Sequence, residues 1–307
     1  MCRSWDACLM DRVLIFGAGY SGQAIARELT QETDFIAGTT RSADKAKVLS
    51  RQGVMPFVYA GEGFSAETRK VLSQATHLIL SVAPGADGDP VLIDLAKLGT
   101  GATPKLQWIG YLSTVGVYGD HGCAWVDEEG ECRPTSSQSR WRIGAEEAWA
   151  AFGRENGIPV AVLRLPGIYG PGRNAFVNLA EGTARRIVKP GQVFNRIHVD
   201  DIAGAVRHLM RAKAGGIFNV SDDEPSPPQD VVAFAAGLMG VEPPPEVPFE
   251  EAGLSPMGRS FYSECKRVSN GKLKASGYSL RYSSYREALS AMWRENAWRG
   301  QAAVNVL

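Results

Sequence analysis

Three glycines near the start of the chain stand at the spacing Gly-x-Gly-x-x-Gly, at Gly17, Gly19 and Gly22. The apolar stretch Val13–Phe16 precedes them, and the helix-like stretch QAIARELT follows. In this context the first glycine permits a tight turn, the second lets a diphosphate approach the backbone, and the third lets helix and strand pack closely. The backbone amides at the helix start, among them those of Tyr20 and Ser21, are expected to face the phosphates. The pattern predicts a dinucleotide site, the alternative being an ordinary glycine turn.

The end of the next expected strand, Asp34–Thr40, indicates which dinucleotide is preferred. An NAD site offers Asp or Glu there to bind the ribose hydroxyls. This chain offers hydroxyl groups and a guanidinium instead, in Thr39, Thr40, Arg41 and Ser42. A carboxylate would repel a 2′-phosphate, whereas a guanidinium pairs with it. We therefore predict NADP(H) rather than NAD. The alternative is that Arg41 is a solvated cation and Ser42 only the N-cap of the helix ADKAKVLS.

Composition is typical of a soluble globular protein. The 307 residues are 44% hydrophobic and 21% charged, which suffices for one large domain or a domain with a smaller lobe. The 33 basic and 33 acidic side chains cancel, so charge gives no basis for binding nucleic acid or an anionic membrane. No apolar run reaches the roughly 18 residues of a membrane helix. We expect a small-molecule substrate, a homodimer as the assembly, and neither nucleic acid nor membrane as a partner.

The first residues, MCRSWDACLMDR, lack the apolar core of a signal peptide, and Met10 is an alternative start to Met1. Cysteines are odd in number and scattered, which is typical of a reducing cytosol; they are Cys2, Cys8, Cys123, Cys132 and Cys265. We therefore expect a cytoplasmic protein. The segment His121-Gly122-Cys123 resembles half of a metal site, but no second pair with ligand spacing exists, so no metal is expected.

Predicted strands and helices alternate along the first half of the chain. The later strands are expected at Phe57–Tyr59, His77–Val82, Leu106–Ser113 and Ile158–Leu165, with a helix over Trp141–Asn156. This order predicts an α/β fold of the Rossmann type, with a doubly wound parallel sheet. Ligands of such sheets bind beyond the carboxyl ends of the strands. Loops 17–22, 83–89, 113–119 and 166–174 are therefore expected to line one cleft.

Three regions follow from this pattern. Residues 1–11 are expected to be a flexible extension, 12–170 a nucleotide-binding Rossmann domain, and 171–307 a smaller C-terminal mixed α/β substrate lobe. The lobe is richer in proline, and its chain is expected to cross back to the sheet near Ile197–Ala205 and Gly216–Val220.

Six segments together resemble the extended short-chain dehydrogenase/reductases, and more narrowly the NAD-dependent epimerase/dehydratase group and its atypical members. The resemblance covers roughly residues 12–290, in the family's order. It is carried by GAGYSGQAIAREL, LSTVGVYGD, LRLPGIYGPGRN, RIHVDDIAGAV, IFNVSDDEP and KRVSNGKLKASGYSLRYSSYREAL. It implies an oxidoreductase or epimerase-like enzyme acting on a small polar substrate, such as a sugar or a nucleotide sugar.

The chain departs from that family at its acid–base pair. Working members use Tyr-x-x-x-Lys on a helix, with a Ser or Thr after the fifth strand; the Lys lowers the Tyr pKa and holds the nicotinamide ribose. Thr114, four residues before Tyr118, matches the hydroxyl position. Aligning Glu146 with the family's acidic residue places Arg142 at the Lys position and Gln138 at the Tyr position. Arg142 can hold ribose hydroxyls, but Gln138 cannot act as an acid or base near neutral pH.

Three explanations stay open for this departure. The protein is an enzyme whose proton comes from elsewhere, the candidates being Tyr118, Tyr169 and Tyr111, with Thr114 and Tyr118 as the expected catalytic residues. Alternatively it binds NADP(H) without turnover, as regulatory atypical members do, and reports redox state to a partner. The third explanation is a shifted helix register, although no tyrosine lies between Tyr118 and Tyr169 to restore the motif.

The resemblance also implies further cofactor contacts. Ala83 and Pro84 follow the fourth strand, where the backbone would pass the adenosine and diphosphate. Pro166, Gly167 and Ile168 follow the sixth strand, where family members hold the nicotinamide amide through backbone groups. The alternative for both segments is a rigid loop, because Pro and Gly are also plain turn residues.

Substrate contacts are expected from the second lobe. The resemblance places a substrate Arg shortly before the IHVDD segment, where Arg196 stands, and Asn174 follows YGPGR. With Tyr169 these are the candidate substrate residues, each with a structural surface role as the alternative. His198, Asp200 and Asp201 are predicted to be structural, as a strand end followed by the acidic start of a helix.

Overall fold

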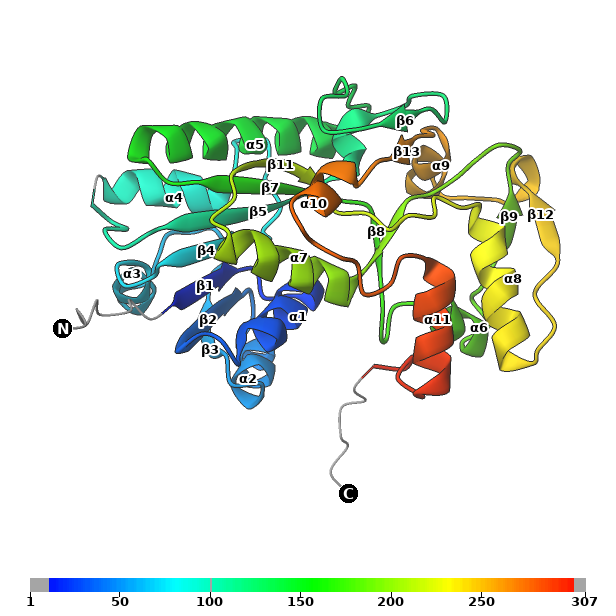
Figure 1. Ribbon diagram of the computed structural model, residues 1–307, viewed down its shortest axis with the longest axis horizontal. Helices are drawn as coiled ribbons and strands as arrows, with labels where there is room; N and C mark the ends of the chain where they lie inside the picture. The colour runs from blue at the N-terminus through cyan, green and yellow to red at the C-terminus, as the bar shows by residue number, and fades with distance from the viewer. Residues whose placement is uncertain (1–10, 100, 301–307) are drawn as a thin grey trace, which may run out of the picture. The chain divides into compact units, whose positions relative to one another are not determined.

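Seven parallel strands form the central sheet of the protein, in the order β11-β7-β5-β4-β1-β2-β3. The computed structural model describes residues 11–99 and 101–300. Figure 1 shows the strands side by side, with helices on both faces of the sheet. Its elements up to the fifth helix are β1 (Arg12–Phe16), α1 (Tyr20–Leu29), β2 (Phe35–Thr40), α2 (Ala43–Arg51), β3 (Met55–Val58), α3 (Ala66–Leu72), β4 (His77–Leu80), α4 (Pro90–Leu98), β5 (Trp108–Thr114), the 3₁₀ helix η1 (Val115–Tyr118), β6 (Trp125–Val126) and α5 (Ser137–Asn156).

Beyond α5 the elements are shorter. They are β7 (Val160–Leu165), β8 (Gly167–Tyr169), α6 (Ala175–Ala180), β9 (Arg186–Val188), β10 (Arg196–His198), α7 (Val199–Arg211), β11 (Gly216–Asn219), α8 (Pro228–Met239), β12 (Glu246–Pro248), the 3₁₀ helix η2 (Phe249–Glu251), α9 (Pro256–Tyr262), β13 (Arg267–Val268), α10 (Gly271–Ala275) and α11 (Tyr285–Arg294). Three two-stranded parallel sheets, β10-β8, β12-β9 and β13-β6, stand apart from the central sheet.

The expected Rossmann-type α/β fold is confirmed, and most strand positions agree within one or two residues. The third strand begins earlier than expected, at Met55. The long helix α5 begins one turn before the expected residue 141, because Ser136 caps it: the Ser136 Oγ accepts a hydrogen bond from the Ser139 amide at 3.1 Å. The Gly216–Val220 crossing is confirmed by β11. In the Ile197–Ala205 segment β10 pairs with β8 and does not join the central sheet, and the chain passes from unit 2 to unit 1 after Ala205.

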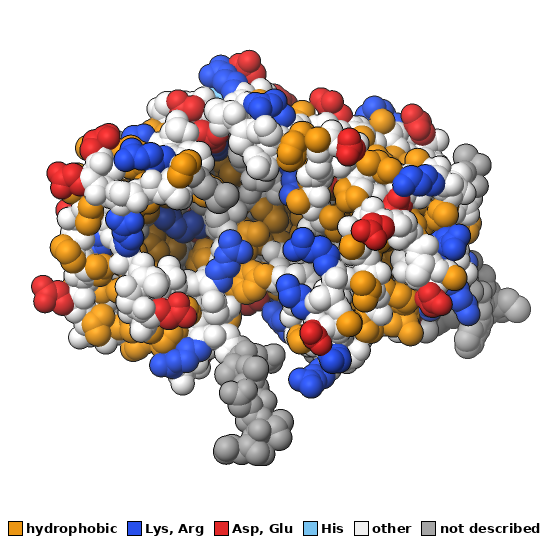
Figure 2. Space-filling model, turned by 180° about the vertical axis from the view of Figure 1, so that it is seen from behind, with side chains coloured by type: hydrophobic (Ala, Val, Ile, Leu, Met, Phe, Trp, Pro, Cys, Tyr) orange, Lys and Arg blue, Asp and Glu red, His pale blue; other side chains and the backbone are white. Residues whose placement is uncertain are grey.

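Two compact units alternate along the chain. Unit 1 contains Met1–Ser113, Trp141–Val162 and Val206–Gly216, and unit 2 contains Thr114–Arg140, Leu163–Ala205 and Ile217–Leu307. The division expected near residue 170 stays a prediction. On the face drawn in Figure 2, basic and acidic side chains are interspersed, in keeping with their equal numbers in the chain.

The core of unit 1 is the apolar sheet itself. Residues Val13–Phe16 of β1 are all buried, and β1 pairs in parallel with both β2 and β4. Such continuous apolarity is typical of a strand covered on both faces. The carboxyl ends of β1, β2 and β4 thus stand next to one another, which places the loops that follow them together.

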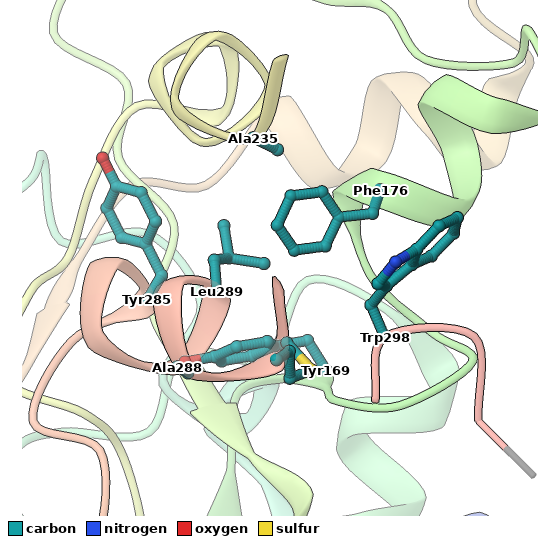
Figure 3. Packing of buried hydrophobic residues seen from close by; sticks show 8 residues of the cluster. Tyr169, Phe176, Ala235, Tyr285, Ala288, Leu289 and Trp298 are labelled. Carbon is teal, nitrogen blue, oxygen red and sulfur yellow. The ribbon is translucent and has the colours of Figure 1, made fainter. Parts of the chain in front are cut away.

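Unit 2 has a separate core between three short helices. Phe176 of α6, Ala235 of α8 and Leu289 of α11 pack there, together with Tyr169 and Trp298 (Figure 3). α7 is anchored to the segment before α11 by a buried carboxylate. The Asp201 side chain accepts hydrogen bonds from the Arg281 amide at 2.6 Å, the Tyr282 amide at 3.1 Å and the Tyr278 hydroxyl at 3.0 Å. The structural role predicted for Asp201 is therefore confirmed.

Candidate functional site

The glycine turn between β1 and α1 is held in place by the end of β2. The Thr39 Oγ1 accepts a hydrogen bond from the Gly17 amide at 2.9 Å, and its carbonyl oxygen accepts one from the Ala18 amide at 2.8 Å. Thr39 is buried, so its hydroxyl serves the turn and is not available to a ribose. The sequence analysis grouped Thr39 with the residues expected near the ribose and did not predict that it holds the glycine turn.

Each glycine of the turn stands in a different environment. Gly17 has a φ of +85°, and a Cβ on it would lie 3.1 Å from the Ser81 backbone. A Cβ on Gly22 would lie 2.9 Å from the Gly17 carbonyl oxygen, so this residue allows helix α1 to approach the turn closely. Gly19 differs, because nothing lies closer than 4.0 Å to its would-be Cβ. Packing therefore explains the first and third glycines but not the second.

Helix α1 begins at this open position without a side-chain cap. Gly19 is its N-cap and supplies no capping side chain. The first backbone hydrogen bond of the helix runs from the Gln23 amide to the Gly19 oxygen at 2.8 Å. The preceding amides of an α-helix have no acceptor within the helix; here they belong to Tyr20, Ser21 and Gly22. Such a helix start attracts phosphate through both its N–H groups and its dipole.

The residues from Thr39 to Ser42, at the end of β2 and just after it, include a cation and no carboxylate. Arg41 is exposed and has no ion pair among the described residues. Ser42 is the N-cap of α2, and its Oγ accepts a hydrogen bond from the Lys45 amide at 3.4 Å. Thr40 is buried, and its carbonyl oxygen accepts a hydrogen bond from the Tyr59 amide at 2.9 Å. The capping role considered for Ser42 is thus present, and Arg41 stays available to a phosphate.

The loop that follows β4 contains Ala83 and Pro84, which differ in solvent exposure. Ala83 is exposed and Pro84 is buried. The neighbouring Ser81 amide donates to the Phe16 carbonyl oxygen at 2.8 Å, which keeps this loop beside the glycine turn. The backbone at Ala83 can therefore contribute to the same site.

Arg142 of α5 is fixed against β5 within unit 1. Its Nη1 donates to the Leu112 carbonyl oxygen at 2.8 Å and lies 3.4 Å from the Tyr111 hydroxyl, with its guanidinium 5.7 Å from the centre of that ring. One turn further along α5, the buried Glu146 accepts a hydrogen bond from Ser113. Gln138 lies one turn before Arg142 on the same helix and is exposed. Gln138 and Arg142 thus lie four residues apart on α5, and their assignment to the positions of the family's Tyr and Lys stays a prediction.

At the end of β5, Thr114 and Tyr118 have different surroundings. Thr114 is half-buried, and its Oγ1 accepts from the Gly116 amide at 3.0 Å, which leaves the hydroxyl proton available. Tyr118 is fully buried; its hydroxyl donates to the Asn219 Oδ1 at 2.8 Å, and the Arg164 guanidinium lies 4.8 Å from its ring centre. Burial raises the pKa of Tyr118. This geometry makes Tyr118 a structural residue of unit 2 and argues against the catalytic role expected for it.

The other tyrosines considered as proton sources are also inside the protein. Tyr111 is completely buried, and burial raises its pKa against the opposing charge of Arg142. Tyr169 is 9% exposed; burial is the largest cause of its raised pKa, followed by the charges of Asp222 and Asp201. A phenol with a raised pKa is a poor base at neutral pH.

Part of the backbone after β7 is engaged in hydrogen bonds within the protein. Gly167 and Ile168 belong to β8, which pairs with β10, and the Gly167 amide donates to the Asn195 carbonyl oxygen at 3.2 Å. That amide is therefore not free for a nicotinamide. Pro166 and Ile168 are half-buried and Gly167 is exposed.

Asn174 is fully engaged within unit 2. Its side-chain nitrogen donates to the carbonyl oxygens of Gly170 at 2.8 Å and Trp298 at 2.7 Å, and its oxygen caps α6 by accepting from the Val177 amide at 3.2 Å. The residue is 8% exposed. These contacts give Asn174 a structural role, and the substrate role expected for it stays a prediction.

Arg196 is half-buried, and its hydrogen-bond partners are neutral. Its Nη1 donates to the Phe194 carbonyl oxygen at 2.9 Å and to the Ser226 Oγ at 2.7 Å. Asp222 stands beside it, since the Asp222 amide donates to the Arg196 carbonyl oxygen at 2.8 Å. The Asp222 Oδ2 is buried without a hydrogen-bond partner, and burial raises the pKa of this carboxyl to about 8. Sequence reasoning missed Asp222, because its position in SDDEP predicts a surface loop.

Two of the scattered cysteines are joined. Cys123 and Cys265 form a disulfide within unit 2, and the Cys123 amide donates to the Cys265 carbonyl oxygen at 2.9 Å. The expectation of scattered thiols is wrong for this pair, which is 142 residues apart in sequence and so leaves no local signal. Cys123 is thereby unavailable as a metal ligand. Within 11–99 and 101–300, no group of three His, Cys, Asp or Glu side chains is placed to hold a metal ion.

No helix in the described part of the chain is long and apolar enough to cross a membrane. The model of the NAD-dependent epimerase/dehydratase family matches residues 101–221. A solved structure of a conserved protein of unknown function from Silicibacter pomeroyi DSS is 44% identical, with a TM-score of 0.84, and the match covers 93% of this chain and 99% of that one.

Two more distant proteins extend the comparison. Protein YeeZ from Escherichia coli (strain K12) is 26% identical over 246 residues, which are 76% of this chain and 86% of YeeZ. The UDP-glucuronic acid 4-epimerase from Bacillus cereus, solved in complex with NAD, is 17% identical with a TM-score of 0.75; the match covers 95% of this chain and 99% of that one and shows a shared fold. With its parallel sheet, glycine turn and matching family model, the chain belongs to the NAD-dependent epimerase/dehydratase family of extended short-chain dehydrogenase/reductases.

Proposed function

We propose that this protein binds NADP(H) at the turn from Gly17 to Gly22 and is an oxidoreductase or epimerase-like enzyme for a small polar compound, such as a sugar or nucleotide sugar. One observation carries the proposal. Helix α1 starts without a side-chain cap at Gly19, the one glycine of the turn whose Cβ would meet nothing within the protein closer than 4.0 Å. Open space at an uncapped helix start suits a diphosphate.

The preference for NADP(H) rests on the end of β2. A 2′-phosphate would meet the exposed Arg41 and the hydroxyl of Ser42, with no carboxylate to repel it. Arg142 is the residue of unit 1 that would hold the nicotinamide ribose, because its guanidinium is anchored to the Leu112 carbonyl oxygen at 2.8 Å and keeps further donors free. When bound, the nicotinamide supplies the hydride donor or acceptor.

A hydroxyl of this chain has to exchange the proton that accompanies hydride transfer. Thr114 is our candidate, because its Oγ1 accepts from the Gly116 amide and its proton stays available to a substrate oxygen. Gln138 cannot exchange this proton, because its amide is neither an acid nor a base near neutral pH. We therefore expect slow turnover, with general acid–base assistance well below that of a tyrosine–lysine enzyme.

The burial of three tyrosines and the absence of one at position 138 favour a second function. Gln138 stands in place of the usual phenol, and Tyr111, Tyr118 and Tyr169 are each buried. This arrangement suits a protein that binds NADP(H) without consuming it and presents the bound state to a partner.

Calorimetric titration with NADPH and NADH tests the binding proposal directly. Tighter binding of NADPH supports it, and the absence of heat with either nucleotide contradicts it. Absorbance of the nicotinamide during incubation with a panel of aldoses, ketoses and nucleotide sugars then separates the two functions. Consumption of NADPH, or formation of an epimer, supports the enzyme; binding with no turnover of any panel member supports the sensor.

A further inference from the structure

A disulfide joins two segments of unit 2 that backbone hydrogen bonds already hold together. Cys123 lies shortly before β6 and Cys265 shortly before β13, and these two strands pair in parallel (Figure 1). The amides of His121 and Cys123 donate to the Cys265 carbonyl oxygen at 3.0 Å and 2.9 Å, and the Cys265 amide donates to the Asp120 Oδ1 at 2.7 Å. The two cysteines are therefore kept as neighbours by contacts that do not involve their sulfur atoms.

The strand pair extends this register beyond the disulfide. The Arg267 amide donates to the Ala124 carbonyl oxygen, and the Ser269 amide donates to the Val126 carbonyl oxygen, each at 2.8 Å. Because these hydrogen bonds need no sulfur atom, we expect the two thiols of the reduced protein to stay close together. Closing the disulfide again is then an intramolecular reaction at high effective concentration. The bond can thus form and break within the folded protein.

The Gly191 carbonyl oxygen lies near both sulfur atoms. It is 3.3 Å from the Cys123 Sγ and 3.8 Å from the Cys265 Sγ. A disulfide has no S–H group to donate, whereas a thiol is a weak hydrogen-bond donor. This oxygen therefore offers an acceptor that only the reduced form can use, so the surroundings suit the dithiol as well as the disulfide.

The two cysteines differ in their access to solvent. Cys123 is half-buried, whereas Cys265 is only 8% exposed. The Arg267 side chain donates to the Cys123 carbonyl oxygen, so a guanidinium lies beside the more accessible cysteine. Thiol–disulfide exchange begins with the attack of a thiolate, and both access and a nearby cation favour this attack. An external thiolate is therefore expected to reach the Cys123 sulfur first.

The disulfide also borders the loop that follows β5. Gly119 ends the 3₁₀ helix η1, and its carbonyl oxygen accepts a hydrogen bond from the Nζ of Lys266, the neighbour of Cys265, at 2.6 Å. A covalent cross-link limits the transient separation of the segments that it joins. Once the disulfide is broken, only non-covalent contacts hold residues 119–125 against β13.

We propose that Cys123 and Cys265 form a site of reversible thiol–disulfide exchange with small thiols, and that their bond limits how often residues 119–125 separate from β13. The site lies within unit 2 and needs no nucleotide. It therefore goes beyond the proposed function and does not depend on it.

The exchange proceeds in two steps. The thiolate of a small thiol attacks the Cys123 Sγ and forms a mixed disulfide with it, while the Cys265 sulfur leaves with the electron pair and takes up a proton. A second thiolate attacks the sulfur of the bound small thiol, and the Cys123 sulfur leaves and is protonated. In total, two small thiols are oxidised to one disulfide, and the protein pair gains two electrons and two protons.

Equilibration of the full-length protein with glutathione and glutathione disulfide tests the reversibility. Oxidised and reduced protein are each brought to a graded series of ratios, alkylated and digested, and mass spectrometry reports the fraction of Cys123 joined to Cys265. We expect this fraction to fall from nearly all to nearly none across the series, with the same curve from both directions and a protein that thermal melting shows to be folded throughout. A pair that stays joined or stays apart at every ratio overturns the site, as does unfolding on reduction.

Two matched variants identify the more reactive sulfur. Cys265→Ser leaves Cys123 without its partner, and glutathione disulfide should then form a mixed disulfide at Cys123. Cys123→Ser leaves the less exposed Cys265, which should react about tenfold more slowly. Thermal melting checks that both variants are folded. Equal rates in the two variants would overturn the assignment of Cys123 as the sulfur that is attacked.

Hydrogen exchange measures the effect on the loop. The amides of His121 and Cys123 should exchange about tenfold faster in the reduced than in the oxidised protein, whereas those of β1 in unit 1 should not change. Equal rates in both forms would contradict the control of residues 119–125. These measurements are made without nucleotide, and calorimetry with NADPH is separate, so failure of this site and failure of the proposed function are distinguished.

Discussion

The Arg142 Nη1 lies 3.4 Å from the Tyr111 hydroxyl and 2.8 Å from the Leu112 carbonyl oxygen, so a helix and a strand of the sheet hold one guanidinium between them. This guanidinium, which we predict to stand at the position of the family's lysine, is thus fixed, while the position one turn earlier carries an exposed amide, Gln138. On this predicted alignment, the group that is missing for acid–base chemistry is a phenol at position 138.

Restoring that phenol gives a direct test. In Gln138→Tyr the new hydroxyl stands one helical turn from Arg142, and the nearby positive charge should lower its pKa below the ordinary value of about 10. Ultraviolet absorbance of tyrosinate, followed against pH and corrected with the wild type, measures this pKa. The double variant with Arg142→Gln should return it toward the ordinary value; identical titrations of the single and double variants would disprove the coupling.

The two glycines that flank the start of α1 should respond in opposite ways to alanine. Gly22→Ala places a Cβ 2.9 Å from a backbone oxygen, so the free energy of unfolding should fall by about 1–3 kcal/mol. Gly19→Ala meets open space and should leave stability nearly unchanged, but its methyl group would occupy the room of the diphosphate and weaken NADPH binding at least tenfold. Urea denaturation and calorimetry measure the two effects. A Gly19→Ala variant with full NADPH affinity would remove the proposed site.

Charge at the end of β2 should control the choice of nucleotide. Arg41→Asp replaces a 2′-phosphate partner with a repelling carboxylate, so we expect affinity for NADPH to fall about a hundredfold and affinity for NADH to change much less. Arg51→Asp, an exposed cation at the far end of α2, serves as the control and should affect neither nucleotide. Equal losses for both nucleotides in Arg41→Asp would contradict the preference for NADP(H).

Asp222 should make the protein less stable as the pH rises through neutrality. Its pKa in the folded protein is raised from 3.8 to about 8, so between these values the folded state holds a proton that the unfolded state has released. The free energy of unfolding should then fall by about 1.4 kcal/mol per pH unit. The window from pH 7 to 8 is informative, because His198, whose pKa burial lowers from 6.5 to about 4, is neutral there in the folded state and largely neutral in the unfolded state.

Asp222→Asn should remove this slope, since an amide does not titrate. Asp223→Asn is the control: that carboxylate is partly exposed and pairs with Lys274 at 2.9 Å, so the slope should persist. Urea denaturation at several pH values measures both variants. A wild-type stability that is level between pH 7 and 8 would show that Asp222 ionises normally.

Local sequence determined the glycine turn and the parallel sheet of this protein. The turn from Gly17 to Gly22, the strand before it and the helix after it lie within one stretch of chain, and the alternation of apolar and helical segments specified the sheet. The placement of Gln138 and Arg142 on one helix could likewise be predicted, because a spacing of four on one helix needs no long-range contact. Helix α5 confirms that spacing.

Tertiary structure alone decided the partners of side chains that pair with residues far along the chain. The Tyr118 hydroxyl donates a hydrogen bond to Asn219, 101 residues away, and Cys123 forms a disulfide with Cys265, 142 residues away. Periodicity reports which face of an element is buried, but the identity of a distant partner depends on how the chain folds back, and that is fixed only when the core packs.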